Sequence, residues 1–179
     1  MNTNETKFLT PAEIIKTVLF AVILGVVLNT YIIANAVVPT GSMSDTIEVN
    51  SKFILDKISY AVIDPRRGDI ITFYAPDDEN TLYLKRIIAL PGETIEGKDG
   101  EVYIDGEVLT EDYVKDKIQD NFGPYEVPED CYFVMGDNRL NSWDSRFWDK
   151  KYVAKDKILG KALFEYSPTL KWFSKEKYK

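Results

Sequence analysis

Residues 38–43 read Val-Pro-Thr-Gly-Ser-Met, and they separate two parts of the 179-residue chain that differ in character. The stretch that ends at Val38, residues 17–38 (TVLFAVILGVVLNTYIIANAVV), has no charged side chain. The part that follows consists of short runs rich in β-branched and aromatic residues, bounded by turn residues. A serine beside a glycine is a common loop element, so Ser42 alone indicates only a turn. Its place at this boundary raises the question of whether another residue makes it reactive.

The apolar segment over 17–38 is long enough to cross a membrane. As an α-helix it would extend roughly 33 Å, against about 30 Å for the hydrocarbon core of a bilayer. Asn29 and Asn35 weaken its last third, so insertion is expected to end near Ile33. We predict a transmembrane anchor over 17–38, preceded by a short N-terminal tail over 1–16.

The residues before the apolar segment predict where its helix begins. Thr10 is a suitable N-cap, Pro11 suits the first helical position, and Glu13 suits the third. Lys7 and Lys16 precede the segment and acidic residues follow it, which slightly favours a cytoplasmic N-terminus.

Two other interpretations of the apolar segment stay open. One is a cleaved secretory signal, because Ala34-Asn35-Ala36 resembles an A-x-A cleavage site. Against it, the run is longer than the usual apolar core of about 7–15 residues, and the residues before it are not clearly basic. The other is a buried helix of a soluble domain, which the absence of a polar face disfavours.

The region over 39–179 predicts a mainly β, all-β domain. A hairpin is expected over 101–109, because Asp105-Gly106 is a typical type I′ turn. Residues 99–130 contain a polar, proline-interrupted part and predict a small peripheral insertion. Further strands are expected at 52–58, 69–74, 81–90, 132–135 and 158–166.

The composition excludes several kinds of site. Net charge is −7, and the charges of the first 38 residues cancel, so residues 39–179 are acidic and a nucleic-acid partner is disfavoured. The chain has no histidine, which removes a Ser-His-Asp triad and a zinc site of the usual kind. The single cysteine, Cys131, excludes an internal disulfide and is typical of a core strand residue.

A reactive serine therefore needs a different base, and a lysine with an accessible neutral form can serve. Burial away from water lowers the lysine pKa from its free value of about 10.4 toward neutrality. Strand alternation places Tyr83, Lys85 and Ile87 on one face of 81–90, so Lys85 lies among apolar side chains. An edge strand protected from aggregation by Lys85 and Arg86 explains the pattern equally well.

A second polar stretch, residues 136–146, reads Gly-Asp-Asn-Arg-Leu-Asn-Ser-Trp-Asp-Ser-Arg. This density of Asp, Asn and Ser favours a loop held by side-chain-to-backbone hydrogen bonds. Asp144 and Arg146 are close enough in the sequence to form an ion pair. The Ser142 hydroxyl could donate or accept a hydrogen bond near a functional site. A well-ordered turn is the alternative, with one or two functional positions.

Together these stretches resemble the type I signal peptidases, or leader peptidases, which are membrane-anchored serine proteases with a Ser–Lys dyad. The resemblance comprises the apolar segment and four motifs in the family's order: 39–43 (PTGSM), 67–73 (RGDIITF), 83–92 (YLKRIIALPG) and 136–146. The length is similar to that of the compact Gram-positive-type members. The fold it implies is a signal-peptidase-like all-β catalytic domain over 39–179, preceded by one N-terminal transmembrane helix.

The resemblance implies roles at the matching positions. Ser42 would be the nucleophile and Lys85 its general base, and the Thr40 hydroxyl would complete an oxyanion hole with the Ser42 backbone N–H. No metal or other cofactor is implied. Shallow pockets for small side chains would be lined by Val38, Pro39, Met43, Tyr83 and Leu84.

Three further positions would support the site without reacting. Ser142 would orient the lysine amine, and Asp144 would pair with Arg146. The sequence also departs from the family pattern. Thr40 replaces a commoner serine, Leu140 replaces a frequent aspartate, and Asp45 stands where proline is usual, so the loop around Ser42 is expected to be less rigid.

The implied activity is removal of signal peptides from exported preproteins, with cleavage after small residues of the A-x-A type. The implied partners are those signal peptides and membrane lipid, close to the secretion translocon. The implied location is the cell membrane, with a cytoplasmic N-terminus and an extracytoplasmic catalytic domain. Three alternatives stay open: a self-cleaving Ser–Lys regulator, an anchored β-domain that binds exported or pilus-type partners without catalysis, and a specialised peptidase with few substrates.

Overall fold

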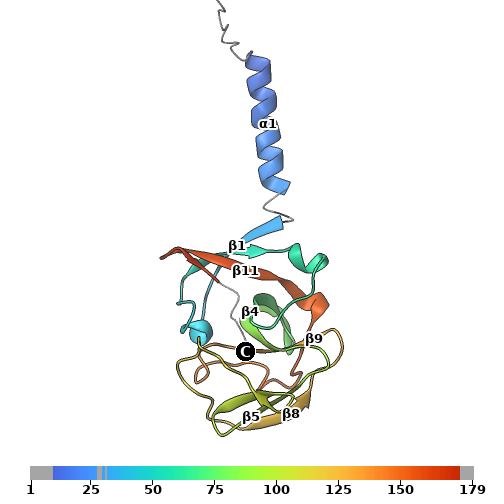
Figure 1. Ribbon diagram of the computed structural model, residues 1–179. Coiled ribbons are helices and arrows are strands. Elements are labelled where there is room, and N and C mark those ends of the chain that lie inside the picture. The colour runs from blue at the N-terminus through green and yellow to red at the C-terminus, as the bar shows by residue number, and fades with distance from the viewer. Residues whose placement is uncertain (1–9, 28–29, 31, 174–179) are drawn as a thin grey trace, which may run out of the picture.

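The computed structural model describes residues 10–27, 30 and 32–173, and it joins an N-terminal helix to a domain of β-strands (Figure 1). Helix α1 (Pro11–Val27) leads away from that domain and has no buried residue. It begins as predicted, since Thr10 Oγ1 accepts the N–H of Glu13 and Glu13 Oε2 accepts the N–H of Thr10. Among the helices of the described residues, none has the length and apolar character needed to span a membrane.

The last part of the span predicted over 17–38 differs from the prediction. It forms strand β1 (Ile33–Val37), which pairs antiparallel with β2 (Lys52–Asp56). The β-branched residues at both ends of β1 favour an extended backbone, and the ladder satisfies its polar groups. Its two alanines pack against the core while its asparagine is exposed, so the Ala-Asn-Ala segment is part of a paired strand.

The larger sheet has eight strands, in the order β1-β2-β11-β3-β4-β9-β10, with β12 paired to β11. A strand of this sheet lies in each of five predicted strand regions: 52–58, 69–74, 81–90, 132–135 and 158–166. Lys85 lies in β4, and β4 is hydrogen-bonded to β3 on one side and β9 on the other, so the edge-strand interpretation is wrong. The bounds are β3 (Ile70–Ala75), β4 (Asp78–Ala89), β9 (Cys131–Met135), β10 (Val153–Ala154), β11 (Ile158–Ser167) and β12 (Lys171–Trp172).

A four-stranded sheet forms the lower end of the domain in Figure 1, in the order β7-β6-β5-β8. Its strands are β5 (Thr94–Lys98), β6 (Glu101–Ile104), β7 (Glu107–Val108) and β8 (Phe122–Glu126). Asp105 and Gly106 both have positive φ, 51° and 83°, which confirms the predicted type I′ turn. This sheet begins before the insertion predicted at 99–130, because β5 pairs with both β6 and β8.

Two groups of buried side chains hold the segments that carry Ser42 and Lys85 in place. One lies between residues 38–47 and the first strands: Val38, Met43, Ile47, Phe53, Leu55, Ile70 and Ala162. The other packs against β3, β4 and β9: Ile71, Phe73, Ile87, Tyr132, Val134, Trp148 and Val153.

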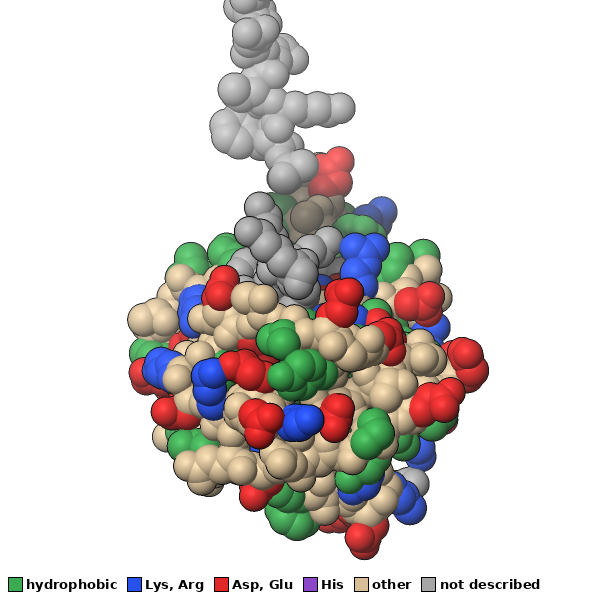
Figure 2. Space-filling view, turned by 60° about the horizontal axis from the view of Figure 1, so that its bottom comes forward, with side chains coloured by type: hydrophobic (Ala, Val, Ile, Leu, Met, Phe, Trp, Pro, Cys, Tyr) green, Lys and Arg blue, Asp and Glu red, His purple; other side chains and the backbone are tan. Residues whose placement is uncertain are grey.

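Figure 2 shows the lower end of Figure 1 turned forward, and acidic and basic side chains are interspersed over that face. The C-terminal lysines Lys175, Lys177 and Lys179, whose possible contact with lipid the sequence leaves open, lie outside the described residues. Residues 1–9 of the predicted N-terminal tail lie outside them as well.

Candidate active site

Ser42 lies in a short 3₁₀ turn, η2 (Gly41–Met43), between β1 and β2. Two backbone hydrogen bonds close the base of this loop, from Val38 N to Ser51 O (3.0 Å) and from Asn50 N to Val38 O (2.8 Å). Met43 is fully buried and fixes the far side of the turn. The turn therefore presents the Ser42 hydroxyl from a firmly held backbone.

Lys85 reaches the same point from the central strand. Its Nζ lies 2.6 Å from Ser42 Oγ, although 43 positions separate the two residues. The side chain of Lys85 lies over the Tyr83 ring, 5.3 Å from Nζ to the centroid, which agrees with the predicted shared face. Lys85 is only 4% exposed, so its amine has little contact with water.

The surroundings of Lys85 favour a neutral amine. Burial lowers the pKa of Lys85 to about 8, from an ordinary 10.5. The carboxylates of Asp144 and Asp137 oppose this change, and the Arg146 cation reinforces it. At pH 8 about half of the amine is therefore unprotonated and able to accept a proton.

A cavity of about 260 Å³ opens beside the two side chains. All five residues predicted for a substrate pocket line it, together with Thr40, whose Oγ1 lies 3.4 Å from Ser42 Oγ. Five further lining residues were not predicted from the sequence. Four of them were close to predicted positions, since two flank Ser142 and two belong to the 81–90 run. The five residues are Gly41, Thr81, Leu82, Asn141 and Trp143.

Asp144 and Arg146 form the predicted ion pair. Arg146 Nε lies 2.8 Å from Asp144 Oδ1 and its Nη2 lies 2.9 Å from Oδ2, and both side chains are almost fully buried. Asp144 Oδ2 also accepts the N–H of Gly136 at 3.0 Å. The pair thus fixes the loop that faces Lys85.

Ser142 differs from its prediction. Its hydroxyl is buried and, among the described residues, has no hydrogen-bond partner, so the expected bond to the Lys85 amine is absent. The hydroxyl packs against Gly136 instead, because a Cβ built on Gly136 would lie 2.2 Å from Ser142 Oγ.

Comparison with known proteins places this constellation in a family. A sequence profile described as signal peptidase, peptidase S26, matches residues 11–167. The chain belongs to this family. It is therefore a hydrolase of the signal peptidase I type, as the sequence motifs indicated.

The relatives agree with that membership. The chain is 40% identical over 163 residues to the signal peptidase I of Leptolyngbya laminosa, covering 87% of this chain and 79% of that protein. It is 38% identical over 161 residues to a probable signal peptidase I-2 of Synechocystis, covering 87% and 73%. Signal peptidase I S of Bacillus subtilis is 36% identical over 154 residues, covering 78% and 82%. A crystal structure of a signal peptidase I from Enterococcus faecalis is 35% identical and covers 56% of this chain and 97% of that one, with a TM-score of 0.46.

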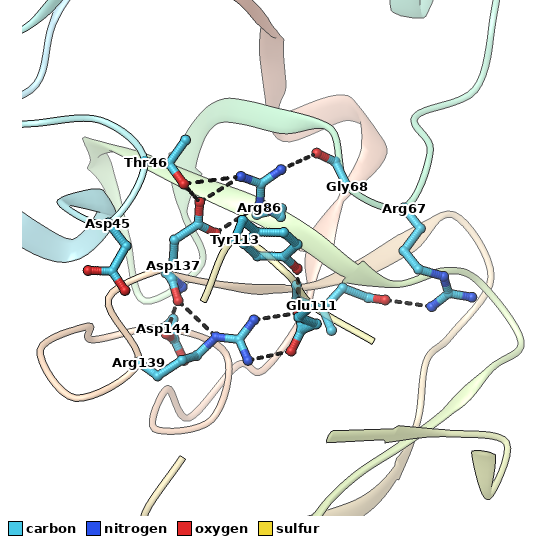
Figure 3. Close-up of polar contacts among 12 residues, drawn as sticks. Asp45, Thr46, Arg67, Gly68, Arg86, Glu111, Tyr113, Asp137, Arg139 and Asp144 are labelled. Carbon is cyan, nitrogen blue, oxygen red and sulfur yellow. Dashed lines mark hydrogen bonds and ion pairs between the residues drawn. The ribbon is translucent and has the colours of Figure 1, made fainter. Parts of the chain in front are cut away.

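Around Ser42 and Lys85 of this signal peptidase family member, loop 136–139 clamps turn η2. Asn138 N donates to Ser42 O at 3.1 Å, and Asn138 Nδ2 donates to Gly41 O at 3.0 Å. Asp137 makes two hydrogen bonds with Arg86, at 2.8 and 2.6 Å, and also accepts the Thr46 hydroxyl at 2.5 Å (Figure 3). Sequence reasoning missed these roles, although the Asp-Asn pair directly after a strand was a signal for them.

Asp45 does not loosen the turn as expected. Its Oδ2 accepts the backbone N–H of Lys115 at 3.1 Å, and its side chain is only 11% exposed. The carboxylate thus ties the turn to a distant segment, which a proline at this position could not do.

Proposed function

We propose that the chain is a membrane-anchored serine endopeptidase that removes N-terminal signal peptides from exported preproteins by a Ser–Lys dyad. The observation that carries the proposal is the 2.6 Å contact between Lys85 Nζ and Ser42 Oγ, with an amine whose pKa is lowered to about 8. No histidine exists in the chain to take the part of the base.

The reaction proceeds in two steps. Neutral Lys85 accepts the Ser42 proton while Oγ attacks the scissile carbonyl, and the ammonium then protonates the departing amine as the C–N bond breaks. The signal peptide stays bound to Ser42 as an ester. Neutral Lys85 next takes a proton from water, whose oxygen attacks the ester, and returns that proton to Ser42.

The neighbouring residues supply charge stabilisation and selectivity. The Ser42 backbone N–H and the Thr40 hydroxyl are assigned to the oxyanion hole, where one such donor contributes about 3–4 kcal/mol. The cavity beside the dyad is small and mainly apolar, which favours Ala and similar side chains of an A-x-A site. The Asp144–Arg146 pair supports the loop without reacting.

The apolar N-terminal segment is assigned to membrane anchoring. Residues 14–27 of α1 expose a nearly continuous apolar surface, with Phe20 at 67% exposure and Ile15 also at 67%. An anchor there, with the N-terminus in the cytoplasm, would hold Ser42 on the extracytoplasmic side, near the translocon where signal peptides emerge.

The test uses the full-length protein in detergent with a panel of preproteins. Sequencing of the new N-termini is expected to show cleavage after small residues, and replacement of the P1 alanine by phenylalanine should abolish it. Ser42→Ala and Lys85→Met should each remove cleavage, whereas Lys155→Met, at a surface ion pair with Asp64, should not. Retained cleavage in either dyad variant contradicts the mechanism. Failure of the unmodified chain to process any preprotein would instead favour an anchored binding domain.

A further inference from the structure

Residues 111–115 run from the small sheet toward turn η2, and we refer to them as the strap. Turn η2 and the residues up to Asp45 are called the nucleophile turn, because they carry Ser42. The strap follows β7, and buried residues on either side of it, Leu109 and Ile118, belong to the core of the small sheet. Alternate residues of the strap contact three different parts of the catalytic scaffold. Figure 3 shows Glu111 and Tyr113 lying between the guanidinium groups of Arg139 and Arg86.

The first contact is with loop 136–139. Both carboxylate oxygens of Glu111 accept from Arg139, at 2.6 and 2.5 Å, and the two side chains are 8% and 2% exposed. Burial disfavours the charged form of Arg139, but the hydrogen bonds and charge of Glu111 prevail and raise its pKa. Arg139 Nε donates in turn to Gly136 O at 3.1 Å. Glu111 therefore fixes the loop that holds Ser42 O.

The second contact is with the strand that carries the base. The Tyr113 ring stacks on the Arg86 guanidinium, with 3.9 Å between Cζ and the ring centroid. Arg86 directly follows Lys85 and is paired with Asp137. The Tyr113 hydroxyl donates to Glu111, so the first two contacts are coupled to each other.

The third contact is with the nucleophile turn itself. The backbone N–H of Lys115 donates to Asp45, three positions after Ser42. Residues 111–114 form a turn, in which the Val114 N–H donates to Glu111 O at 3.1 Å. This turn lets one short segment reach all three targets.

We propose that the strap sets the relative position of Ser42 and Lys85, with Glu111, Tyr113 and Asp45 as positioning residues. This inference rests on the proposed Ser–Lys dyad. Proton transfer across 2.6 Å is sensitive to small displacements, and a shift of about 1 Å costs about a hundredfold in rate. None of residues 111–115 lines the cavity beside Ser42 and Lys85, so loss of the strap should act on kcat rather than on substrate binding.

The experiment measures peptide cleavage by the full-length protein in detergent as a function of pH. Tyr113→Leu and Glu111→Gln are expected to lower kcat about tenfold to a hundredfold with little change in KM. Tyr113→Phe keeps the ring over Arg86 but loses the hydroxyl that donates to Glu111, so its kcat should fall less than that of Tyr113→Leu. In Tyr113→Leu the acid limb of the kcat profile should also move above pH 8, because a displaced amine regains water.

The matched control is Glu93→Gln, which removes a carboxylate from a partly buried ion pair with Arg67 away from the strap. It should leave kcat and the pH profile unchanged. If Tyr113→Leu or Glu111→Gln fails to fold, the pair Asp45→Ala and Asp45→Asn replaces them, since Asn still accepts the Lys115 N–H and Ala does not.

Unchanged kcat and pH profiles in the strap variants, or an equal loss in Glu93→Gln, would overturn the strap proposal. That result leaves the dyad intact as long as Lys85→Met is inactive. Cleavage by Lys85→Met would instead remove the proposed function, and the two failures are therefore distinguishable.

Discussion

Lys85 illustrates a conflict between stability and chemistry at the scale of one residue. Its amine must be buried to be neutral near pH 8, and the burial is unfavourable while the amine is protonated. Between pH 8 and 10.5 the unfolded chain holds this proton more often than the folded chain does. Stability should therefore rise with pH across that window, and the full penalty should apply below pH 8.

We predict that Lys85→Met makes the protein more stable at neutral pH. The difference should approach about 3 kcal/mol at pH 7, since one pKa unit corresponds to about 1.4 kcal/mol. It should diminish as the pH rises toward 10.5. Urea unfolding of the full-length protein in detergent at several pH values measures this, with Lys155→Met as the surface control. A gap that widens with pH would show that burial of the charged amine is not its origin.

At the scale of elements, the contact between loop 136–139 and turn η2 depends on one missing side chain. A Cβ on Gly136 would lie 2.4 Å from Ser42 O and 2.2 Å from Ser142 Oγ. Backbone atoms cannot move aside as easily as a flexible side chain, so any substitution here should displace the nucleophile turn.

We therefore predict that Gly136→Ala lowers kcat about a hundredfold by misplacing Ser42. Gly106→Asn is the control, because the tip of its hairpin is open space and Asn tolerates positive φ. Both variants are compared in the peptide assay and by thermal unfolding. Unaltered cleavage by a folded Gly136→Ala protein would mean that the turn and the loop are not tightly coupled.

The elements also show what the sequence could predict. Strand alternation placed Lys85 and Tyr83 on one face, and the Asp-Gly turn and the helix N-cap are local signals that fix local structure. The prediction of a helix over 33–37 is wrong, because these residues pair with β2. Pairing between distant segments cannot be predicted from a hydropathy pattern. Strand β8 was not predicted, because it contains a proline and has polar neighbours. It is held by contacts of Phe122 with the core.

In the candidate site, too, local features could be predicted from the sequence and long-range contacts could not. The sequence pointed to Ser42 and Lys85 as the proposed reacting pair through the absence of histidine, strand alternation and the resemblance to signal peptidases. The contacts that support the pair could not be predicted, since nothing local in the sequence says that Glu111 meets Arg139 or that Asp45 meets Lys115. The hydrogen bond predicted from Ser142 to the Lys85 amine is absent, because the Ser142 hydroxyl is buried without a partner among the described residues and lies close to Gly136.

At the scale of the molecule, the β domain begins at β1 rather than after Pro39. We predict that removal of residues 1–27 leaves peptide cleavage in detergent near the full-length value. The shortened protein should no longer sediment with lipid vesicles. Removal of residues 1–37 should lower both stability and cleavage, because β2 then loses its ladder partner. Equal behaviour of the two truncations would show that β1 adds nothing to the domain.

The order of two adjacent residues on β4 has a consequence for how an active molecule is made. Lys85 pairs in register with Ile71, and Arg86 pairs with Ile70 and Met135. If β4 slipped by one residue, a guanidinium would take the place of the amine, and guanidinium does not give up its proton in proteins. Such a molecule could be compact and still inert, so the activity per folded molecule reports the fidelity of strand pairing during folding.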